Sequence, residues 1–437
     1  MSSSLLFACT DSSTSPGLAS PATAAPAIGV ASTCDPNNGS LKLPAGFCAR
    51  VFAEGVFNAR QIAVTPHGDL YVAVDTVPNP GVRGGIVALR DANGDGRAEV
   101  RQFFGSTGGN GIAWRNGQLF FASETQVVRW DLPSGTLLPP QMETVVVAGL
   151  TGGGDHHRKT VVVDGSDNLF VNIGSATNSC QVVNRTDFSP GVDPCPELAV
   201  RAGVWRFSAS GSGQVQSVAA RYATELRNMN ALAIDPGNGM LYGVQNGRDQ
   251  LFDNWPNLYD AQDDALLPSE ELFRIEAGKR YGWPYCYHDA QRQAKILSPE
   301  YGGNAIRVGR CETREKPLAT YPAHWAPLSI LFYTGTQFPT AYQGGLFIAF
   351  HGSRFDASQQ PAGPGYIVAF VPWANGAPTG GYQTFADGLI GAGRTPLTAR
   401  HRAVGLAQGP DGSLYISDDK GGFIWRVFYT GSGSTSP

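Results

Sequence analysis

The feature that most constrains the fold is a strand-turn-strand unit that recurs along the chain. In each copy two short apolar segments flank a turn rich in Gly, Pro and Asp, as in LAQGPDGSLYISDD. Most copies are followed by a third apolar segment, so each unit is expected to form a small antiparallel sheet. The copies cover residues 62–75, 112–124, 161–175, 232–246, 406–419 and, more loosely, 330–353.

Small sheets of this kind can cover both faces by stacking radially around a central channel. The sequence therefore predicts an all-β fold, a six-bladed β-propeller with long inter-strand loops, over residues 34–430 and closed by the C-terminal segment GFIWRVFY. A flat two-sheet sandwich is the alternative, but it does not explain the repeated Gly/Pro-Asp-Gly turn between paired segments. The 55 Gly and 30 Pro residues fit many short strands joined by tight turns.

The termini and the cysteines indicate an exported protein, periplasmic or extracellular. Residues 1–33 are expected to be a leader and flexible tether, and residues 431–437 a disordered tail. Cys9 follows LLFA, which resembles the end of a bacterial lipoprotein signal and makes Cys9 a candidate lipid anchor; the alternative is a disordered start. The other six cysteines favour three disulfides over buried free thiols because they form sequence-local pairs. These pairs are Cys34/Cys48, Cys180/Cys195 and Cys286/Cys311.

Composition and motifs argue against several classes of function. The net charge is −4 and no basic tract is present, so nucleic acid is not an expected partner. No 18-residue run is free of charged or turn residues, so no transmembrane span is expected. The chain has no C-x-x-C for zinc or haem attachment and no G-x-S-x-G nucleophile elbow. GLIGAGRT lacks the flanking strand and helix of a dinucleotide site.

Polar and cationic residues stand directly before the inner strand of each predicted blade. In a propeller these positions converge at the mouth of the channel. We therefore expect six segments to lie together there: those ending at Arg60 and Asn110, DHHRK at 155–159, LRNMN at 226–230, PAHWAPL at 322–328 and ARHR at 399–402. A chain of net negative charge that gathers cations at one place favours an anionic ligand there. Arginine forks suit carboxylates, which indicates a small planar molecule with several carboxylate groups.

Four longer motifs carry a resemblance to a known family: LRNMNALAIDP, SEELFRIEAGKRYGWP, LFIAFHGS and RHRAVGLAQGPDG. Over residues 41–430 the sequence resembles the soluble quinoprotein sugar dehydrogenases, the glucose/sorbosone dehydrogenase family. These are six-bladed propellers that carry pyrroloquinoline quinone (PQQ) and calcium. The resemblance implies oxidation of a CH–OH group of a sugar or sugar-derived aldose or pyranose, with hydride passing from the substrate carbon to C5 of PQQ.

The resemblance also implies roles for individual residues. His156 matches the general base, and His157 is expected to face the other way because neighbouring strand-like residues alternate. Asp155 matches a substrate-contacting carboxylate, and Asn110 at the mouth is expected to contact substrate with it. The main-chain carbonyls of Gly247 and Arg248 match the calcium ligands. The cofactor-binding residues are expected to be Arg60, Arg227, Asn228, His324, His351, Arg354, Arg400 and Arg402.

This sequence departs from the family pattern at three positions. The carboxylate that orients the catalytic histidine aligns with Ser175, so we expect water or Asp155 to orient His156 instead. A glutamine that contacts glucose aligns with Gly109, which argues against glucose as the natural substrate. Arg248 replaces the proline of the calcium loop, which is tolerable because the ligand there is a main-chain oxygen.

A second calcium site is a candidate in DANGDGRAEV at 91–100. Asp91, Asn93 and Asp95 occupy alternate positions before Gly96, as at the start of an EF-hand loop. The twelfth position is Gln102 rather than the usual Glu, so a plain hairpin turn is the alternative.

Two other functions stay open beside the sugar dehydrogenase. A calcium-dependent propeller lactonase would need several carboxylates and an Asn at the mouth, where this chain gathers cations. A non-catalytic propeller that binds a partner is compatible with the same fold. Because the chain has no haem motif or flavin site, a dehydrogenase would pass its electrons to a separate acceptor, a cytochrome or a quinone.

Overall fold

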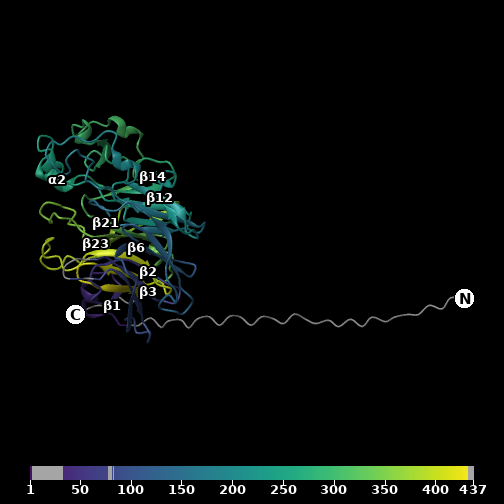
Figure 1. Ribbon diagram of the computed structural model, residues 1–437. Helices are drawn as coiled ribbons and strands as arrows, with labels where there is room; N and C mark the ends of the chain where they lie inside the picture. Colours follow the sequence, from purple (N-terminus) through teal and green to yellow (C-terminus); the bar gives the residue numbers. More distant parts are fainter. Residues whose placement is uncertain (2–32, 77–80, 82, 432–437) are drawn as a thin grey trace.

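Figure 1 shows the computed structural model of the chain, which describes residues 33–76 and 83–431 together with Met1 and Gly81. Its strands form six large sheets, the number of blades that the sequence repeats predict. The first blade holds β2 (Ala59–Val64), β3 (Leu70–Val74), β4 (Gly85–Arg90) and β5 (Val100–Phe104). The second holds β6 (Gly109–Arg115), β7 (Gln118–Ser123), β8 (Val127–Asp131) and β9 (Thr144–Ala148), and β13 (Gln214–Val215) pairs in parallel with β9.

The remaining four blades follow in chain order. The third holds β10 (Val161–Val163), β11 (Asn168–Ile173), β12 (Gly203–Ser208) and β14 (Arg221–Thr224), and the fourth holds β15 (Ala231–Ile234), β16 (Leu241–Gln245), β17 (Glu270–Ile275) and β20 (Ala319–Tyr321). The fifth holds β21 (Pro327–Phe332), β22 (Leu346–Phe350), β23 (Ile367–Val371) and β26 (Gln383–Ala386), and the sixth holds β27 (Ala403–Gln408), β28 (Leu414–Asp418), β29 (Ile424–Tyr429) and β1 (Phe47–Ala53).

The blades close into a ring in which both ends of the described chain share one sheet. The inner strands contact each other in the order β2, β6, β10, β15, β21, β27 and back to β2. β29 is the third strand of the sixth blade, and β1 pairs antiparallel with it as the outermost strand. The C-terminal segment therefore closes the ring together with an N-terminal strand that the repeat pattern did not predict.

Alternation of side chains along the strands explains why the blades stack. In β3, Leu70, Val72 and Val74 pack into one apolar cluster, whereas Tyr71 and Ala73 pack into the next. All five side chains are buried because each face of the sheet meets a neighbouring blade. A sheet buried on both faces is what radial stacking requires, and a sandwich would leave one face of each sheet exposed.

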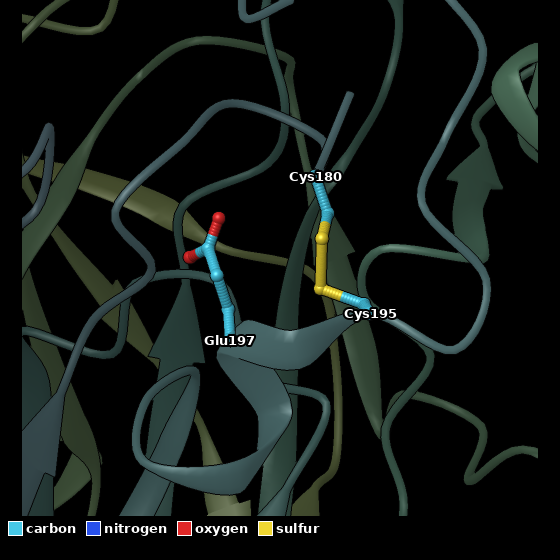
Figure 2. A group of neighbouring side chains, drawn as sticks. All are labelled: Cys180, Cys195 and Glu197. Atoms are coloured by element: carbon cyan, nitrogen blue, oxygen red, sulfur yellow. A yellow bond between two sulfur atoms is a disulfide. The ribbon is translucent and has the colours of Figure 1, made fainter. Parts of the chain in front are cut away.

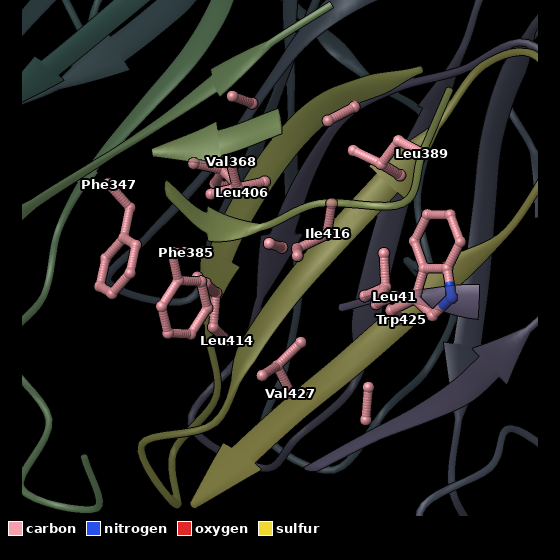
Figure 3. Close-up of a cluster of buried hydrophobic side chains, with 14 of the residues drawn as sticks. Leu41, Phe347, Val368, Phe385, Leu389, Leu406, Leu414, Ile416, Trp425 and Val427 are labelled. Carbon is pink, nitrogen blue, oxygen red and sulfur yellow. The ribbon is translucent and has the colours of Figure 1, made fainter. Parts of the chain in front are cut away.

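The largest apolar cluster lies between the fifth and sixth blades (Figure 3). Trp425, Ile416 and Val427 from the sixth blade meet Phe347 and Phe385 from the fifth. β1 joins this cluster through Phe47 and Ala49, so the same packing that holds the two blades together also anchors the closing strand.

Short helices and hairpins occupy the long loops. α1 (Leu251–Asn254) and α2 (Ala261–Leu266) follow β16, and Asp260 caps α2 by accepting from the main-chain N–H groups of Gln262 and Asp263. Figure 1 shows α2 toward the side of the molecule where β12 and β14 lie, far from β1. The remaining short elements are η1 (Pro36–Ser40), η2 (Pro196–Ala199), η3 (Pro299–Tyr301), η4 (Gly309–Thr313), η5 (Thr340–Tyr342) and the hairpins β18 (Cys286–Asp289)/β19 (Ala294–Leu297) and β24 (Trp373–Ala374)/β25 (Ala377–Pro378).

All three predicted disulfides are present: Cys34–Cys48, Cys180–Cys195 and Cys286–Cys311. The candidate anchor Cys9 lies outside the described residues, as do the predicted leader and tail apart from Met1, Thr33 and Gly431. Among the described residues, no helix is both long and apolar enough to cross a membrane.

Candidate active site at the channel mouth

The residues that precede the inner strands meet across the channel, as the blade pattern predicts. We call this end of the channel the mouth. Arg60 Nε donates to Asn110 Oδ1 at 2.9 Å, and Asn110 Nδ2 donates to the carbonyl of Lys159 at 3.1 Å, which links the first three blades. Gln61 Nε2 reaches across to the carbonyl of Asn230 in the fourth blade at 2.9 Å.

His156 lies at the mouth directly beside the end of β11. Its Nδ1 is 3.0 Å from the main-chain oxygen of Ser175 and 2.9 Å from its hydroxyl oxygen. A carbonyl only accepts, and the Ser175 hydroxyl already donates to the carbonyl of Thr177 at 2.7 Å. Nδ1 must therefore carry the proton, which leaves the lone pair on Nε2.

This close approach depends on Gly174. A Cβ atom there would lie 2.6 Å from both the Cβ and the main-chain oxygen of His156, so a larger residue would push the imidazole away from Ser175. We expected Asp155 or water to orient His156, and that expectation is wrong because Ser175 supplies both acceptors itself. His157 makes a separate contact, with Nδ1 3.4 Å from the carbonyl of Gly154.

The surroundings of His156 keep its imidazole neutral. Burial and the positive charge of Arg227 hold the pKa of His156 well below its ordinary value of 6.5, against the opposing charge of Asp249. An imidazole that is neutral near pH 7 with a free Nε2 can accept a proton, which is what a general base does.

Arg227 connects His156 to the loop that follows β16. Its Nη1 donates to the carbonyl of Gly247 at 2.6 Å, and its Nη2 donates to Asp249 Oδ2 at 3.0 Å. Its Nε and Nη2 also hold the carbonyl and side-chain oxygen of Asn178. The carbonyl of Gly247 therefore faces a cation at the mouth, next to a carboxylate that the sequence did not reveal.

His324 is the second histidine of this group and is charged. Its Nε2 lies 2.8 and 3.0 Å from the carbonyls of Asp264 and Leu267, and its Nδ1 lies 3.4 Å from Asp249 Oδ1. Because every neighbour of the ring is an acceptor, both nitrogens carry hydrogens. Burial would lower the pKa of His324, but the hydrogen bond and charge of Asp249 outweigh it and raise the pKa above its ordinary value.

A second group surrounds Asp419, which follows β28. Arg60 Nη1 donates to Asp419 at 2.7 Å, and His351 Nε2 lies 3.0 and 3.1 Å from the two carboxylate oxygens. Arg402 Nη1 donates to His351 Nδ1 at 3.2 Å, and its Nη2 donates to the hydroxyl of Tyr366 at 2.8 Å. Burial raises the pKa of Asp419, but contacts with His351 and Arg60 outweigh this effect and hold it below its ordinary value.

The arginines of the mouth differ in what balances their charge. Arg60 pairs with Asp419, Arg227 with Asp249, and Arg158 with Asp75. The partners of Arg402 are neutral, and no carboxylate of the described chain lies within ion-pair distance of it. Arg402 is half-buried, and its positive charge is therefore available to an anionic ligand.

The surroundings of three predicted residues do not support their expected roles. Arg354 is bound through Nη2 to Asp264 Oδ2 at 2.6 Å and stacks on Phe355, on the outer side of His324. Arg400 is exposed and has no hydrogen bond or ion pair within the described ranges. Asn110 is 1% exposed and its carboxamide is fully used between blades, so its placement does not support the predicted substrate contact.

The side chain of Arg248 is used inside the protein, whereas Asn228 has a side-chain oxygen without a partner among the described residues. Arg248 directs its guanidinium away from the mouth, to Glu300 Oε2 at 2.5 Å. This buried ion pair fixes the loop from inside, which leaves only the main chain of Arg248 for the predicted calcium contact. Asn228 Oδ1 is buried and has no hydrogen-bond partner in the described structure.

The candidate second calcium loop lies at the far end of β4, away from the mouth. Carboxylate oxygens of Asp91, Asp95 and Glu99 lie within 4.8 Å of one another, and Glu99 is a member that the EF-hand spacing did not predict. Asp91 already accepts from the N–H groups of Gly94 and Gly96, as a plain Asx-type turn does. Both interpretations of this loop stay predictions.

A third cluster with potential metal ligands is excluded by its chemistry. Figure 2 shows Cys180, Cys195 and Glu197 side by side. The two sulfurs form a disulfide, so neither can be a thiolate ligand. The Glu197 carboxylate accepts from Ala176 N and Thr177 Oγ1, each at 2.5 Å.

The comparisons with known proteins agree with the propeller fold. The sequence model of the TrAA12-like family matches residues 41–430. The chain belongs to the TrAA12-like family. The predicted resemblance to quinoprotein sugar dehydrogenases is confirmed at the level of family and fold.

Solved structures and one curated relative are similar to this TrAA12-like chain. The holo form of the PQQ domain of pyranose dehydrogenase from Coprinopsis cinerea is 19% identical, with a TM-score of 0.69 over 89% of this chain and 97% of that one. A calcium structure of the Trichoderma reesei member of carbohydrate-active enzymes family AA12 is 20% identical, with a TM-score of 0.69 over 89% and 96%. The PQQ-bound aldose sugar dehydrogenase from Streptomyces coelicolor is 16% identical, with a TM-score of 0.53 over 88% and 100%.

The curated relative is an uncharacterised protein from Borreliella burgdorferi. It is 30% identical over 206 residues, which is 47% of this chain and 47% of the relative. The match therefore spans about half the length of the curated relative.

The mouth of the TrAA12-like chain fits an anionic cofactor with a calcium ion. Arg402 offers a cation without a carboxylate partner, and Asn228 Oδ1 is a buried acceptor that a bound group could satisfy. The carbonyl of Gly247 and the carboxylate of Asp249 both accept from Arg227, and such oxygens are the ligands that calcium prefers. The donor set and its charges are therefore compatible with both groups.

Sequence reasoning missed the carboxylates that organise the site. Asp249 and Asp419 each follow the second strand of a blade, whereas the predicted residues precede the first strand. In an antiparallel pair, the end of the second strand lies at the same edge of the sheet as the start of the first, so residues after second strands are also expected at the mouth.

Proposed function

We propose that this protein is a PQQ- and calcium-dependent dehydrogenase that oxidises a CH–OH group of a sugar. The observation that carries the proposal is His156, a neutral imidazole whose Nε2 is free and whose Nδ1–H is held by Ser175 beside Arg227. The TrAA12-like family and the sugar dehydrogenases with the same fold support this assignment.

The residues of the mouth have distinct roles in this proposal. Arg402, Arg227 and Asn228 would hold the cofactor, and the main-chain carbonyls of Gly247 and Arg248 would hold calcium. PQQ, when bound, supplies the acceptor for the hydride that leaves the substrate carbon. His156 Nε2 takes the proton of the substrate hydroxyl, and Ser175 keeps the ring in the orientation and tautomer that this step requires.

The electrons then leave through a separate acceptor, a cytochrome or a quinone. The sequence has no haem-attachment motif and no flavin fingerprint that could take them within the chain. We therefore expect molecular oxygen alone to support little turnover, measured in a catalase-protected assay. The three disulfides support export to an oxidising compartment, periplasmic or extracellular.

Reconstitution tests the proposal directly. Purified protein is mixed with PQQ and calcium, separately and together, and dye reduction is followed with a panel of pyranoses and aldoses. Sugar-dependent dye reduction only when both are present supports the proposal. Absence of PQQ binding at micromolar concentration rejects it. Hydrolysis of lactones that requires calcium but not PQQ would instead identify the lactonase alternative.

A further inference from the structure

A loop after β11 carries an arginine, Arg185, that the sequence motifs did not single out. The loop is closed at its base by the Cys180–Cys195 disulfide and by a bridge between Gln181 and Gly191. Arg185 has a φ of 55°, and its N–H donates to Gln181 Oε1 at 2.9 Å. Contacts within the loop therefore fix the backbone of Arg185 independently of the contacts of its side chain.

The guanidinium of Arg185 spans the two segments that flank the site. Its Nε and Nη2 lie 3.1 and 3.0 Å from Asp155 Oδ2, next to the proposed base. Its Nη2 also lies 3.4 Å from Asp249 Oδ2, and its Nη1 donates to Gln250 Oε1 at 2.8 Å. Arg185 thus connects the His156 segment with the segment after the proposed calcium ligands.

These groups line the opening of the mouth and are not part of its core. The side chains of Arg185, Asp155 and Asp249 are 32%, 30% and 31% exposed. Partly exposed ion pairs of this kind contribute little to stability, so stability alone does not explain a bridge built by a disulfide-closed loop.

The hydrogen-bonding groups that remain unused have a defined chemistry. Arg185 takes only Oδ2 of Asp155, and no described residue donates to Oδ1. One hydrogen of Arg185 Nη1 likewise has no acceptor among the described residues. A free carboxylate acceptor and a free guanidinium donor therefore belong to two side chains in direct contact, and Asp155 directly precedes His156 in the chain.

We propose that Arg185 completes a sugar-recognition subsite with Asp155, whose contact with substrate the family resemblance already implies, and that the two side chains bind neighbouring hydroxyls of a pyranose. A hydroxyl can donate to Asp155 Oδ1, and an adjacent hydroxyl can accept from Arg185 Nη1. Arg185 also fixes the direction of the Asp155 carboxylate. It therefore affects specificity both through its own hydrogen bond to the sugar and through the orientation of Asp155. This inference rests on the proposed sugar oxidation and adds which residue selects the substrate.

The test compares each monodeoxy analogue of the best sugar with the parent sugar, in wild type and in Arg185→Gln. In wild type, removal of a recognised hydroxyl is expected to lower kcat/KM by about 10- to 100-fold, because charged partners lose a hydrogen bond. In Arg185→Gln, KM for the parent sugar is expected to rise at least about tenfold with kcat within about threefold, and the penalty for the same analogue to fall to about threefold or less. An unchanged KM and an unchanged analogue pattern overturn the inference.

Two further variants separate recognition from structure. Arg185→Lys keeps the charge without the fork and is expected to restore part of the affinity for the parent sugar. Arg274→Gln is the matched control, since Arg274 is an exposed arginine paired with Glu276 at the far end of β17. It is expected to leave KM and the analogue pattern unchanged, and a loss equal to that of Arg185→Gln contradicts the inference.

Sugar binding followed by saturation-transfer NMR separates this inference from the proposed function. If wild type with PQQ and calcium oxidises no sugar, the proposed function fails while binding still decides the inference. Weaker sugar binding in Arg185→Gln than in wild type supports the subsite. Equal binding in the two proteins, or no binding in either, overturns it.

Discussion

At the scale of single residues, the strongest feature is the tautomer that Ser175 imposes on His156. Replacement of His156 with Ala is expected to lower turnover by about 10²- to 10⁴-fold, the usual loss for a general base. PQQ binding is expected to persist because the cofactor-binding groups around Arg402 stay in place. Dye-coupled kinetics and PQQ fluorescence measure the two effects. His157→Ala is the control and should change little, and a reversal of the two phenotypes would show that the other histidine is the base.

The pH dependence of the reaction follows from the same residue. A base works only when it is deprotonated, and burial with the charge of Arg227 holds the pKa of His156 well below 6.5. Activity should therefore persist below pH 6.5 and decline only at more acid pH. The profile of kcat/KM between pH 4 and pH 8 measures this limb. An acid limb at or above pH 6.5 would contradict a neutral His156 in the free enzyme.

How much of the site was predictable depended on where each partner lies in the chain. His156, Arg227 and Asn228 stand within recognisable motifs directly before inner strands, so position was enough to place them at the mouth, and the family resemblance supplied their expected roles. Asp419 interacts with Arg60 across 359 positions of sequence, and Asp249 with Arg227 across 22. Such pairs depend on which strand ends share an edge, and that information exists only after the blades have assembled.

At the scale of elements, the sequence predicted the blades and the closing C-terminal segment but not β1, the N-terminal strand that pairs with it. β1 has no matching hairpin of its own, and it becomes a strand because β29 offers it an edge. The pattern of apolar residues at 47–53 is too short to distinguish a strand from a buried turn without that partner.

Phe47 tests the contribution of this closing strand. Its ring is 3% exposed and contacts Phe338 and Phe385 at centroid distances of 4.8 and 4.9 Å. Phe47→Ala is expected to cost about 3–5 kcal/mol of unfolding free energy, measured by urea denaturation. Phe57 is 54% exposed, so Phe57→Ala should cost much less. Equal losses in the two variants would mean that β1 does not anchor the ring.

At the scale of the whole molecule, the mouth is organised by alternating charges from different blades. Asp155, Arg185, Asp249 and Arg227 follow one another in contact, and Asp419 joins Arg60 to His351. Asp249 holds Arg185 and Arg227, and Asp419 holds Arg60 and His351, so each of these two carboxylates connects separate segments around the mouth. In a chain of net charge −4, Arg402 then presents a cation that no described carboxylate balances at ion-pair distance.

The pH dependence of the unfolding free energy should reveal a buried amine, Lys159, which the proposed reaction does not use. Lys159 is 1% exposed, and its Nζ donates to the carbonyl of His157 at 2.6 Å beneath the segment that carries the base. Burial, with a smaller contribution from Arg201, lowers the pKa of Lys159 to about 7. An unfolded lysine keeps its ordinary pKa of 10.5, so between pH 7 and pH 10.5 the unfolded state binds one proton more than the folded state.

The unfolding free energy must then rise with pH in this window, by up to about 1.4 kcal/mol per pH unit. Below pH 7 the folded state bears the full free-energy cost of a protonated, buried amine. Lys159→Met removes the titrating group while keeping most of its volume. Urea denaturation at pH 7, 8 and 9 is therefore expected to show a steeper rise of stability with pH in wild type than in the variant, with a difference of about 2–3 kcal/mol across the two units. Other titrating groups are common to both proteins and cancel in this comparison. Parallel pH curves would show that Lys159 is not held uncharged at the base of the mouth.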